Sequence, residues 1–279
     1  MKNVLFFLIS MLFATASIGQ NTSENQKINR KGSMYFYWGW NWEKYSKSDI
    51  NFSGSNYNFT LYNMIANDRP SKFDFDTYFN PTRLTIPQYN FRLGYFLNEH
   101  YNFSIGIDHM KYVMLPLQSV GIKGNINNGT SFDGKYSGEN IQLTENFLKF
   151  EHTDGLNYAN VEFRRFDEVY NYKNIKFNIT DGIGIGMLIP RTNTTLMNNP
   201  RYDQFHLAGF GIGAVVGVNI ELYKYFFIQS EFKTGFINMP DIRTTSSTSD
   251  KASQHFFFYQ INALFGARFN IPCPDNKEN

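Results

Sequence analysis

Apolar and polar residues alternate with a period of two along much of the chain. Between His206 and Leu222, every even-numbered position from 210 onward is apolar, and most odd-numbered positions are glycine or polar. Successive side chains of a β-strand point to opposite faces of its sheet. The alternation therefore predicts a strand with one apolar face and one small or polar face.

Seven further segments show the same period, so the sequence predicts eight strands: Met34–Trp42, Gln88–Leu97, Tyr101–Val113, Tyr158–Phe166, Ile175–Ile189, His206–Leu222, Phe226–Asn238 and Phe256–Ile271. Several are longer than the five or six residues typical of soluble sheets. The connections alternate in length along the chain. Short ones lie at Asn98–His100, Asp167–Asn174 and Tyr223–Tyr225, and long polar ones at Glu43–Pro87, Met114–Asn157, Pro190–Phe205 and Pro240–His255.

This pattern of strands and connections resembles the small outer-membrane β-barrels of Gram-negative bacteria. The resemblance implies an all-β, up-and-down antiparallel barrel of eight transmembrane strands over residues 33–271, with short periplasmic turns and long extracellular loops. A secreted lipocalin-like barrel is the competing architecture. The glycine-rich polar face and the bulk of the apolar face disfavour it, because an eight-stranded interior is narrow.

A polar face directed into such a barrel would bury charged side chains. The predicted lumen holds acidic residues and basic residues in nearly equal number: Asp108, Glu162, Glu221 and Glu231 against Arg92, Arg164, Lys233, Arg268 and Lys176. A lone buried charge is costly, so we expect these groups to pair, with Arg92 close to Asp108. This balance favours a packed lumen over an open pore.

The first predicted strand contains all three tryptophans of the chain, within "MYFYWGWNWEKY". Trp38, Trp40 and Trp42 share one face with Phe36, and the opposite face carries tyrosine, glycine, asparagine and glutamate. One interpretation is a platform that stacks against a sugar. The other is an aromatic girdle, because indole rings favour the membrane interface, and the barrel context favours this one.

The ends of the chain indicate export. Residues 1–19 have a single positive charge at Lys2, an apolar run of about ten residues and then small residues, which predicts a signal peptide. We expect a periplasmic segment at 20–32, a C-terminal tail at 272–279 and a location in the cell outer membrane. The only cysteine is Cys273, so intramolecular disulfides are excluded. The formal net charge of +2 gives no case for nucleic acid as a partner.

Candidate acid–base residues lie near the loop end of the predicted barrel: Asp108, His109, His152, His206 and His255. Some barrels of the resembled family are lipid-modifying enzymes, such as lipid A deacylases and palmitoyltransferases. The His-x-Ser order expected of a deacylase occurs here only reversed, in Ser253-Gln-His255, and parity puts Asp108 and His109 on opposite faces. No metal-ligand spacing or phosphate-binding loop occurs, so we expect no metal and no cofactor.

Three functions follow as hypotheses. The first is a structural or surface-interaction role, carried by the loops of a barrel with a packed polar lumen. The second is a lipid-modifying enzyme similar to a lipid A deacylase or acyltransferase, and the third is a narrow solute channel. The expected partners are outer-membrane lipid and an extracellular ligand or envelope protein, and we expect a monomer.

Overall fold

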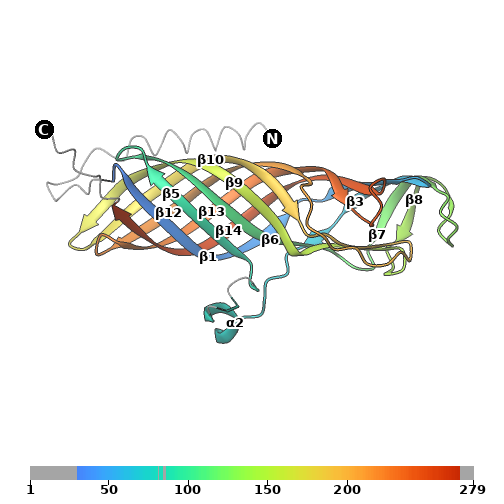
Figure 1. The fold of residues 1–279 in the computed structure, drawn as a ribbon, viewed down its shortest axis with the longest axis horizontal. Coiled ribbons are helices and arrows are strands. Elements are labelled where there is room, and N and C mark those ends of the chain that lie inside the picture. Colours follow the sequence, from blue (N-terminus) through green and yellow to red (C-terminus); the bar gives the residue numbers. More distant parts are fainter. Residues whose placement is uncertain (1–29, 81, 84–85, 271–279) are drawn as a thin grey trace, which may run out of the picture.

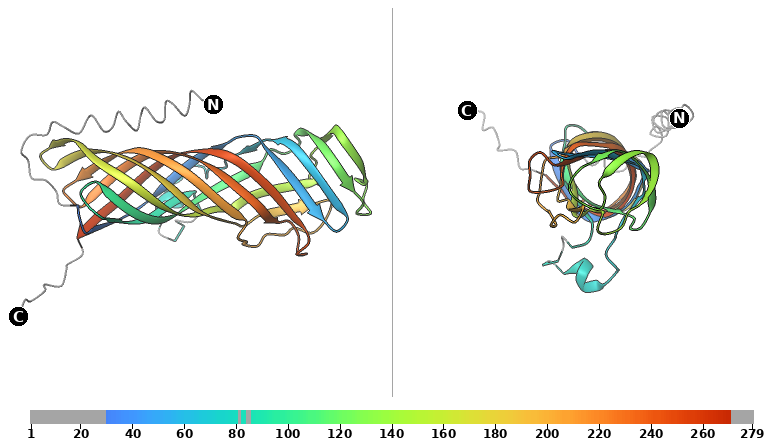
Figure 2. Two further views of the ribbon diagram at one scale, coloured as in Figure 1. Left: turned by 90° about the horizontal axis from the view of Figure 1, so that it is seen from above. Right: turned by 90° about the vertical axis from the view of Figure 1, so that its right-hand side faces the viewer.

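Eight long strands form a closed ring in the computed structural model, which describes residues 30–80, 82–83 and 86–270. The strands of the ring are β1 (Ser33–Tyr45), β5 (Tyr89–Phe96), β6 (Tyr101–Met114), β9 (Leu148–Tyr172), β10 (Ile175–Pro190), β12 (Gly209–Leu222), β13 (Phe226–Arg243) and β14 (Lys251–Asn270). Each is antiparallel to the next, and β1 pairs with β14 to close the ring (Figures 1 and 2). The predicted eight-stranded up-and-down barrel is confirmed. The signal peptide, the C-terminal tail and most of the 20–32 segment lie outside the described residues.

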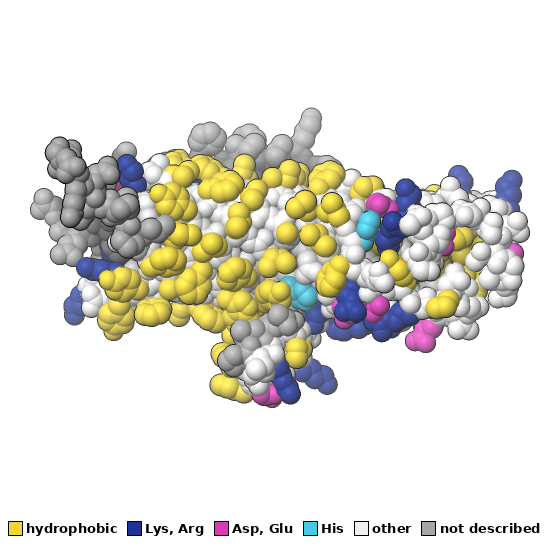
Figure 3. Space-filling model, in the orientation of Figure 1, with side chains coloured by type: hydrophobic (Ala, Val, Ile, Leu, Met, Phe, Trp, Pro, Cys, Tyr) yellow, Lys and Arg dark blue, Asp and Glu magenta, His cyan; other side chains and the backbone are white. Residues whose placement is uncertain are grey.

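The predicted faces of the strands are also confirmed. Along β14, Phe257, Ile261 and Phe265 are exposed on the outside, whereas Gln260 and Asn262 are buried inside. Figure 3 shows a broad hydrophobic belt across the visible face of the barrel. A transmembrane barrel presents such a belt to lipid.

Ring strand β9 differs most from its prediction. It spans 25 residues and extends the predicted Tyr158–Phe166 segment at both ends. The turn predicted at Asp167–Asn174 therefore shrinks to two residues, Lys173 and Asn174, with Lys173 at a positive φ of 55°. Both ends of this strand contain many polar and charged residues, which weaken the apolar alternation that predicts a strand.

Beyond the belt the sheet continues into what we call the extension. Strands β2 (Ser48–Gly54), β3 (Tyr57–Met64), β7 (Ser119–Ile126) and β8 (Gly134–Gln142) pair in that order, starting from the first residues of β14. Two short strands, β4 (Ala66–Asn67) and β11 (Asn193–Leu196), pair with β6 and β9. Much of what the sequence predicted as loops at 43–87 and 114–157 is thus sheet (Figure 1).

The extension has the opposite polarity to the barrel. Its inward side chains form one buried apolar cluster, which includes Phe52, Phe59, Phe147, Phe150 and Met239. Charged and polar side chains cover much of its outside, as Figure 3 shows at the end remote from the belt. The extension thus has the polarity of a protein in water, where burial of apolar surface drives folding.

A short helix, α2 (Phe75–Phe79), interrupts the connection between β4 and β5. Asp74 caps it by accepting a hydrogen bond from the backbone N–H of Thr77. Figure 1 shows this segment projecting sideways from the barrel wall. Among the described residues, no helix has both the length and the apolar character needed to cross a membrane.

Candidate functional site

Two clusters of ion pairs fill the lumen, and the first lies around Arg164. Its guanidinium contacts Glu162, with Nη2 2.5 Å from a carboxylate oxygen, and also pairs with Glu231. Tyr37 receives hydrogen bonds from Nε of Arg92 at 2.9 Å and from Arg164 at 3.0 Å. All of these side chains are almost fully buried. Each charge therefore has partners that offset its loss of hydration.

The second cluster joins Asp108 to Lys233, from the opposite side of the ring. The Lys233 ammonium pairs with Asp108 and lies 2.7 Å from Glu162. Asp108 also accepts hydrogen bonds from the side-chain amides of Asn90 and Asn160, at 2.9 and 3.1 Å. Its carboxylate is 3.9 Å from the guanidinium of Arg92, which confirms the predicted proximity. Three acids and three bases thus occupy the centre of the lumen with no excess charge.

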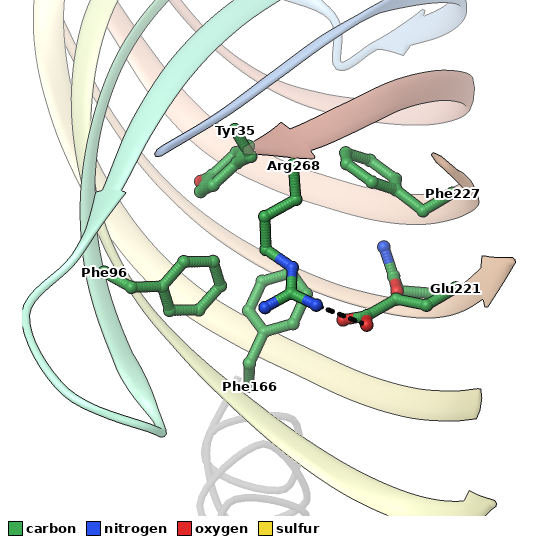
Figure 4. A pocket seen from close by; sticks show the side chains of 7 residues that line it. Tyr35, Phe96, Phe166, Glu221, Phe227 and Arg268 are labelled. Atoms are coloured by element: carbon green, nitrogen blue, oxygen red, sulfur yellow. Dashed lines mark hydrogen bonds and ion pairs between the residues drawn. The ribbon is translucent and has the colours of Figure 1, made fainter. Parts of the chain in front are cut away.

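At the periplasmic end, Glu221 and Arg268 form a further pair at 3.1 Å (Figure 4). Arg30 precedes β1, yet its side chain is buried and lies 3.4 Å from Glu221. Lys176 pairs with Glu168 at 3.1 Å. The five predicted basic residues and four predicted acidic residues of the lumen are therefore all buried, and all take part in ion pairs.

Aromatic rings close the space between the centre and the periplasmic pair. Tyr35, Phe96, Phe166 and Phe227 pack together with Tyr37 and Leu264. Figure 4 shows four of these rings around Arg268, where they line a cavity. The cavity volume is only about 10 Å³, which is at the lower limit of what a cavity needs to hold a single water molecule.

The extracellular mouth of the lumen is polar as well. Glu43 lies between Gln88 and Gln260, and Gln260 donates to it at 2.9 Å. Its backbone N–H donates to Asp68 at 2.9 Å. The alternation placed Glu43 on the face opposite the tryptophans, and the structure confirms this face because β1 continues to Tyr45. Glu43 was absent from the predicted lumen charges only because the predicted strand ended at Trp42.

The candidate residues Asp108 and His109 lie on opposite faces of β6, as parity predicted. His109 stacks on Tyr89 with ring centroids 5.0 Å apart, and its Nδ1 lies 2.8 Å from the side-chain oxygen of Asn157. Asp108 is held inside the lumen by the contacts above. The pair therefore does not form a shared acid–base unit.

The candidate His152 lies inside the core of the extension with no exposed surface. Phe150 and Tyr112 pack against its ring, and Nδ1 is 2.9 Å from the hydroxyl of Thr192. Burial lowers its pKa to about 3, so the imidazole is neutral at physiological pH. Its sequence neighbour Asp154 instead lies 3.5 Å from Arg201 on the surface.

The remaining candidates are separate from these and from each other. His206 lies 3.1 Å from Asp241 in a partly buried pair. His255 is exposed on β14 and its ring faces Phe236, with centroids 6.0 Å apart. Among the described residues, the hydrogen bonds, ion pairs and ring contacts of the candidate histidines do not join them into one set. Within the same residues, no cluster of three His, Cys, Asp or Glu side chains is arranged to hold a metal ion.

The aromatic residues of β1 lie on the two faces that the alternation predicted. Phe36 and Trp42 are exposed on the outside, while Tyr35, Tyr37 and Asn41 are buried in the lumen. Trp38 and Trp40 contact each other and Phe265 of β14, with centroid separations of 5.1 to 5.9 Å. Every indole is thus on the outer wall.

Comparison with protein-family models and with curated protein sequences found no match. Several solved structures are similar to this chain. OprG from Pseudomonas aeruginosa is 10% identical, with a TM-score of 0.44 over 88% of this chain and 100% of its own. Ail, the attachment invasion locus protein of Yersinia pestis, is 9% identical, with a TM-score of 0.31 over 86% and 99%. The outer membrane protease OmpT from Escherichia coli is 7% identical, with a TM-score of 0.27 over 89% and 99%.

These names describe different roles, and all three TM-scores are below 0.5, so the likeness selects none of the roles. The fold is established by the chain's own strand pairing and polarity. A closed ring of eight antiparallel strands, apolar outside and polar inside, is the architecture of an outer-membrane barrel. The chain therefore folds as a closed eight-stranded β-barrel of the outer-membrane type.

Proposed function

We propose that this barrel is a non-conducting, non-enzymatic surface protein that contacts a ligand or partner outside the cell through its extension. The observation that carries the proposal is the separate apolar core of the extension. A barrel that only spanned the membrane would need no strands or core beyond the belt. A folded, rigid surface loses less conformational entropy on binding than mobile loops do, which suits recognition.

The packed lumen supports a role other than conduction. Arg92, Arg164 and Lys233 cross the lumen to carboxylates on other strands, and aromatic rings close the periplasmic side. An ion passing through would have to displace buried, mutually paired charges. Opening such a network leaves charges without partners, at a cost of several kcal/mol each.

The candidate histidines give the enzyme hypothesis little support. A general acid or base must reach the proton that it transfers. His152 is buried within the core. One ring nitrogen of His109 already faces Asn157, and one of His206 faces Asp241. Among the described residues, the hydroxyl that bonds one of these histidines is that of Thr192, and it is buried beside His152 where no substrate reaches it.

Conductance across planar lipid bilayers tests the first half of the proposal. We expect no discrete current steps from the purified full-length barrel. The variant with both Asp108→Asn and Lys233→Met should remain closed too, because Arg92, Arg164, Glu162 and Glu231 still fill the lumen. Steady single-channel steps from the wild-type protein would overturn the non-conducting role.

Binding of protein-bearing lipid vesicles to arrays of glycans and extracellular proteins tests the second half. We expect an interaction that weakens when Lys135 and Glu139, exposed on β8, are changed to alanine. The matched control is Lys173→Ala in the periplasmic turn, which should bind as the wild type does. Equal binding by all three proteins would contradict contact through the extension. Lipid A turnover that depends on His109 or His206 would instead contradict the non-enzymatic role.

A further inference from the structure

The segment that carries α2 packs on the outer wall of the barrel. The ring centroid of Trp40 lies 5.5 Å from Tyr78 and 5.3 Å from Phe79. Trp40 is on the outward face of β1, the face that also carries Phe36 and Trp42. The helix therefore covers part of the wall that a transmembrane barrel turns toward lipid.

The surroundings of this contact are lipid-facing on both neighbouring strands. Phe265 of β14 lies 5.9 Å from Trp40, and Phe91 of β5 is the register partner of Trp38. Both phenylalanines are exposed on the outside of the barrel. Figure 3 shows the projecting segment beside the hydrophobic belt, at the end toward the extension. The helix is thus continuous with the belt.

The segment carries a patch of exposed phenylalanines. Phe73 and Phe75 are 72% and 71% exposed, and Phe79 is 49% exposed. Their rings form a connected patch, with Phe75 stacked on Phe79 at 4.8 Å and 6.2 Å from Phe73. In water, so much exposed aromatic surface in one place would be unfavourable.

The carboxylates of the same segment are satisfied within it. Asp76 pairs with Arg83 at 2.5 Å, and Asp74 is occupied in capping the helix. The remaining charge of residues 72–79 is the exposed Lys72 next to Phe73, and a basic residue beside aromatic ones is typical of segments that lie at a membrane surface. An amphipathic segment of this kind suits the boundary between water and acyl chains.

We propose that residues 72–79 form a lateral anchor whose phenylalanines, Phe73, Phe75 and Phe79, insert into the outer leaflet of the membrane beside the barrel. The occupant of the patch is lipid acyl chain. Continuity of the patch with the lipid-facing wall, through Trp40, is the observation that favours lipid over a protein partner. The inference does not depend on the role proposed for the extension.

Spin labels on single cysteines test the anchor in phosphatidylcholine vesicles that hold the full-length barrel. The background is Cys273→Ser, and the reporter is Phe75→Cys. Two reference sites bracket the result, Ile261→Cys on the exposed belt and Asn140→Cys on β8 of the extension. Accessibility to oxygen, which partitions into lipid, and to a water-soluble nickel chelate is measured at each site.

We expect the label at position 75 to match position 261, with high oxygen accessibility and low nickel accessibility. A label that matches position 140 would overturn the anchor. So would one shielded from both reagents, because that outcome means coverage by a second copy or another protein. Phe73→Cys provides an independent reporter if the first variant does not fold, as judged by its heat-dependent migration in gels.

Discussion

At the scale of single residues, His152 shows how a change of environment alters a side chain's chemistry. The sequence places it near the outer rim, where an acid–base role is conceivable. The structure encloses it between Tyr112 and Phe150, where burial lowers its pKa to about 3. His152 therefore contributes to the stability of the extension, and it makes that stability depend on pH.

The folded extension should lose stability as pH falls from about 6.5 toward 3. In that range the unfolded chain binds a proton at His152 that the folded chain does not bind, so the free energy of unfolding falls with decreasing pH. Each pH unit is worth about 1.4 kcal/mol for one such group. Urea unfolding at several pH values should show this slope in the wild type and a smaller one in His152→Gln.

The control for this experiment is Thr192→Val, which removes the hydrogen-bond partner of His152 and keeps the histidine. It should lower stability by a similar amount at every pH. The difference in unfolding free energy between the wild type and His152→Gln should change with pH. A difference that stays constant from pH 4 to 7 would disprove that His152 is buried in its neutral form.

Parity alone located most of the lumen charges, because a side chain's face depends only on its position within a strand. Arg92, Asp108 and Glu162 are buried where the alternation put them. Arg30 was missed because it lies before the first strand, in a stretch with no alternation. The burial of His152 was missed because its neighbours were interpreted as loop, although Leu148 and Phe150 alternate with Lys149 and Glu151.

At the scale of the element, glycine on the inner face of a strand makes room for a ring from its neighbour. On β5, Gly94 faces the Tyr35 ring of β1, and a Cβ at position 94 would lie 2.2 Å from that ring. Tyr35 in turn donates a hydrogen bond to the side-chain oxygen of Asn102, at 2.8 Å. Because position 94 has no side chain, the Tyr35 ring of β1 can pack over β5 and reach Asn102 on β6.

Substitution of Gly94 by valine should displace Tyr35 and break its bond to Asn102. Overpacking of this kind typically costs about 1–3 kcal/mol. We expect Gly94→Val to unfold at lower urea concentration in detergent micelles, with Gly134→Val on β8 as the matched control. The nearest atoms to a Cβ at 134 are 3.8 Å away, so the control should unfold like the wild type. A Gly94→Val variant as stable as the control would refute the packing argument.

The strands of the ring were predictable because they are long and lie between lipid and lumen, which imposes strict alternation. Those of the extension were harder to find. β7 has apolar residues at Val120, Ile122 and Ile126, which is a period of two over a short distance. β8 is exposed along most of its length and has no apolar face, so its sequence carries almost no strand signal.

At the scale of the whole molecule, the chain consists of two parts with opposite polarity that share strands. β9 passes through both. Its inward residues are Leu148 and Phe150 in the extension and Glu162 and Arg164 in the barrel. Each part has its own source of stability, apolar burial in one and ion pairs with lipid contact in the other. Damage to one should therefore spare the other.

Truncation of Phe59 tests this independence. Phe59 is fully buried in the extension, with Phe52 and Phe147 rings 5.4 and 5.8 Å away. Phe59→Ala should cost about 3–5 kcal/mol and make the extension sensitive to protease. The barrel should still migrate as a folded species in unheated gels. The control is Leu117→Ala, at an exposed site, which should resist protease like the wild type. Loss of the folded barrel in Phe59→Ala would show that the two parts are one cooperative unit.

The reversal of polarity along β9 has a consequence for where the protein stands in the membrane. Sinking by a few ångströms would push the polar outside of the extension into hydrocarbon, and rising would bring the belt into water. These two opposing free-energy costs hold the molecule at one depth in the membrane. The nine residues from Leu148 to Leu156 then reach roughly 30 Å along the strand from the belt. The chain thus sets a fixed distance between the cell surface and whatever the tip meets.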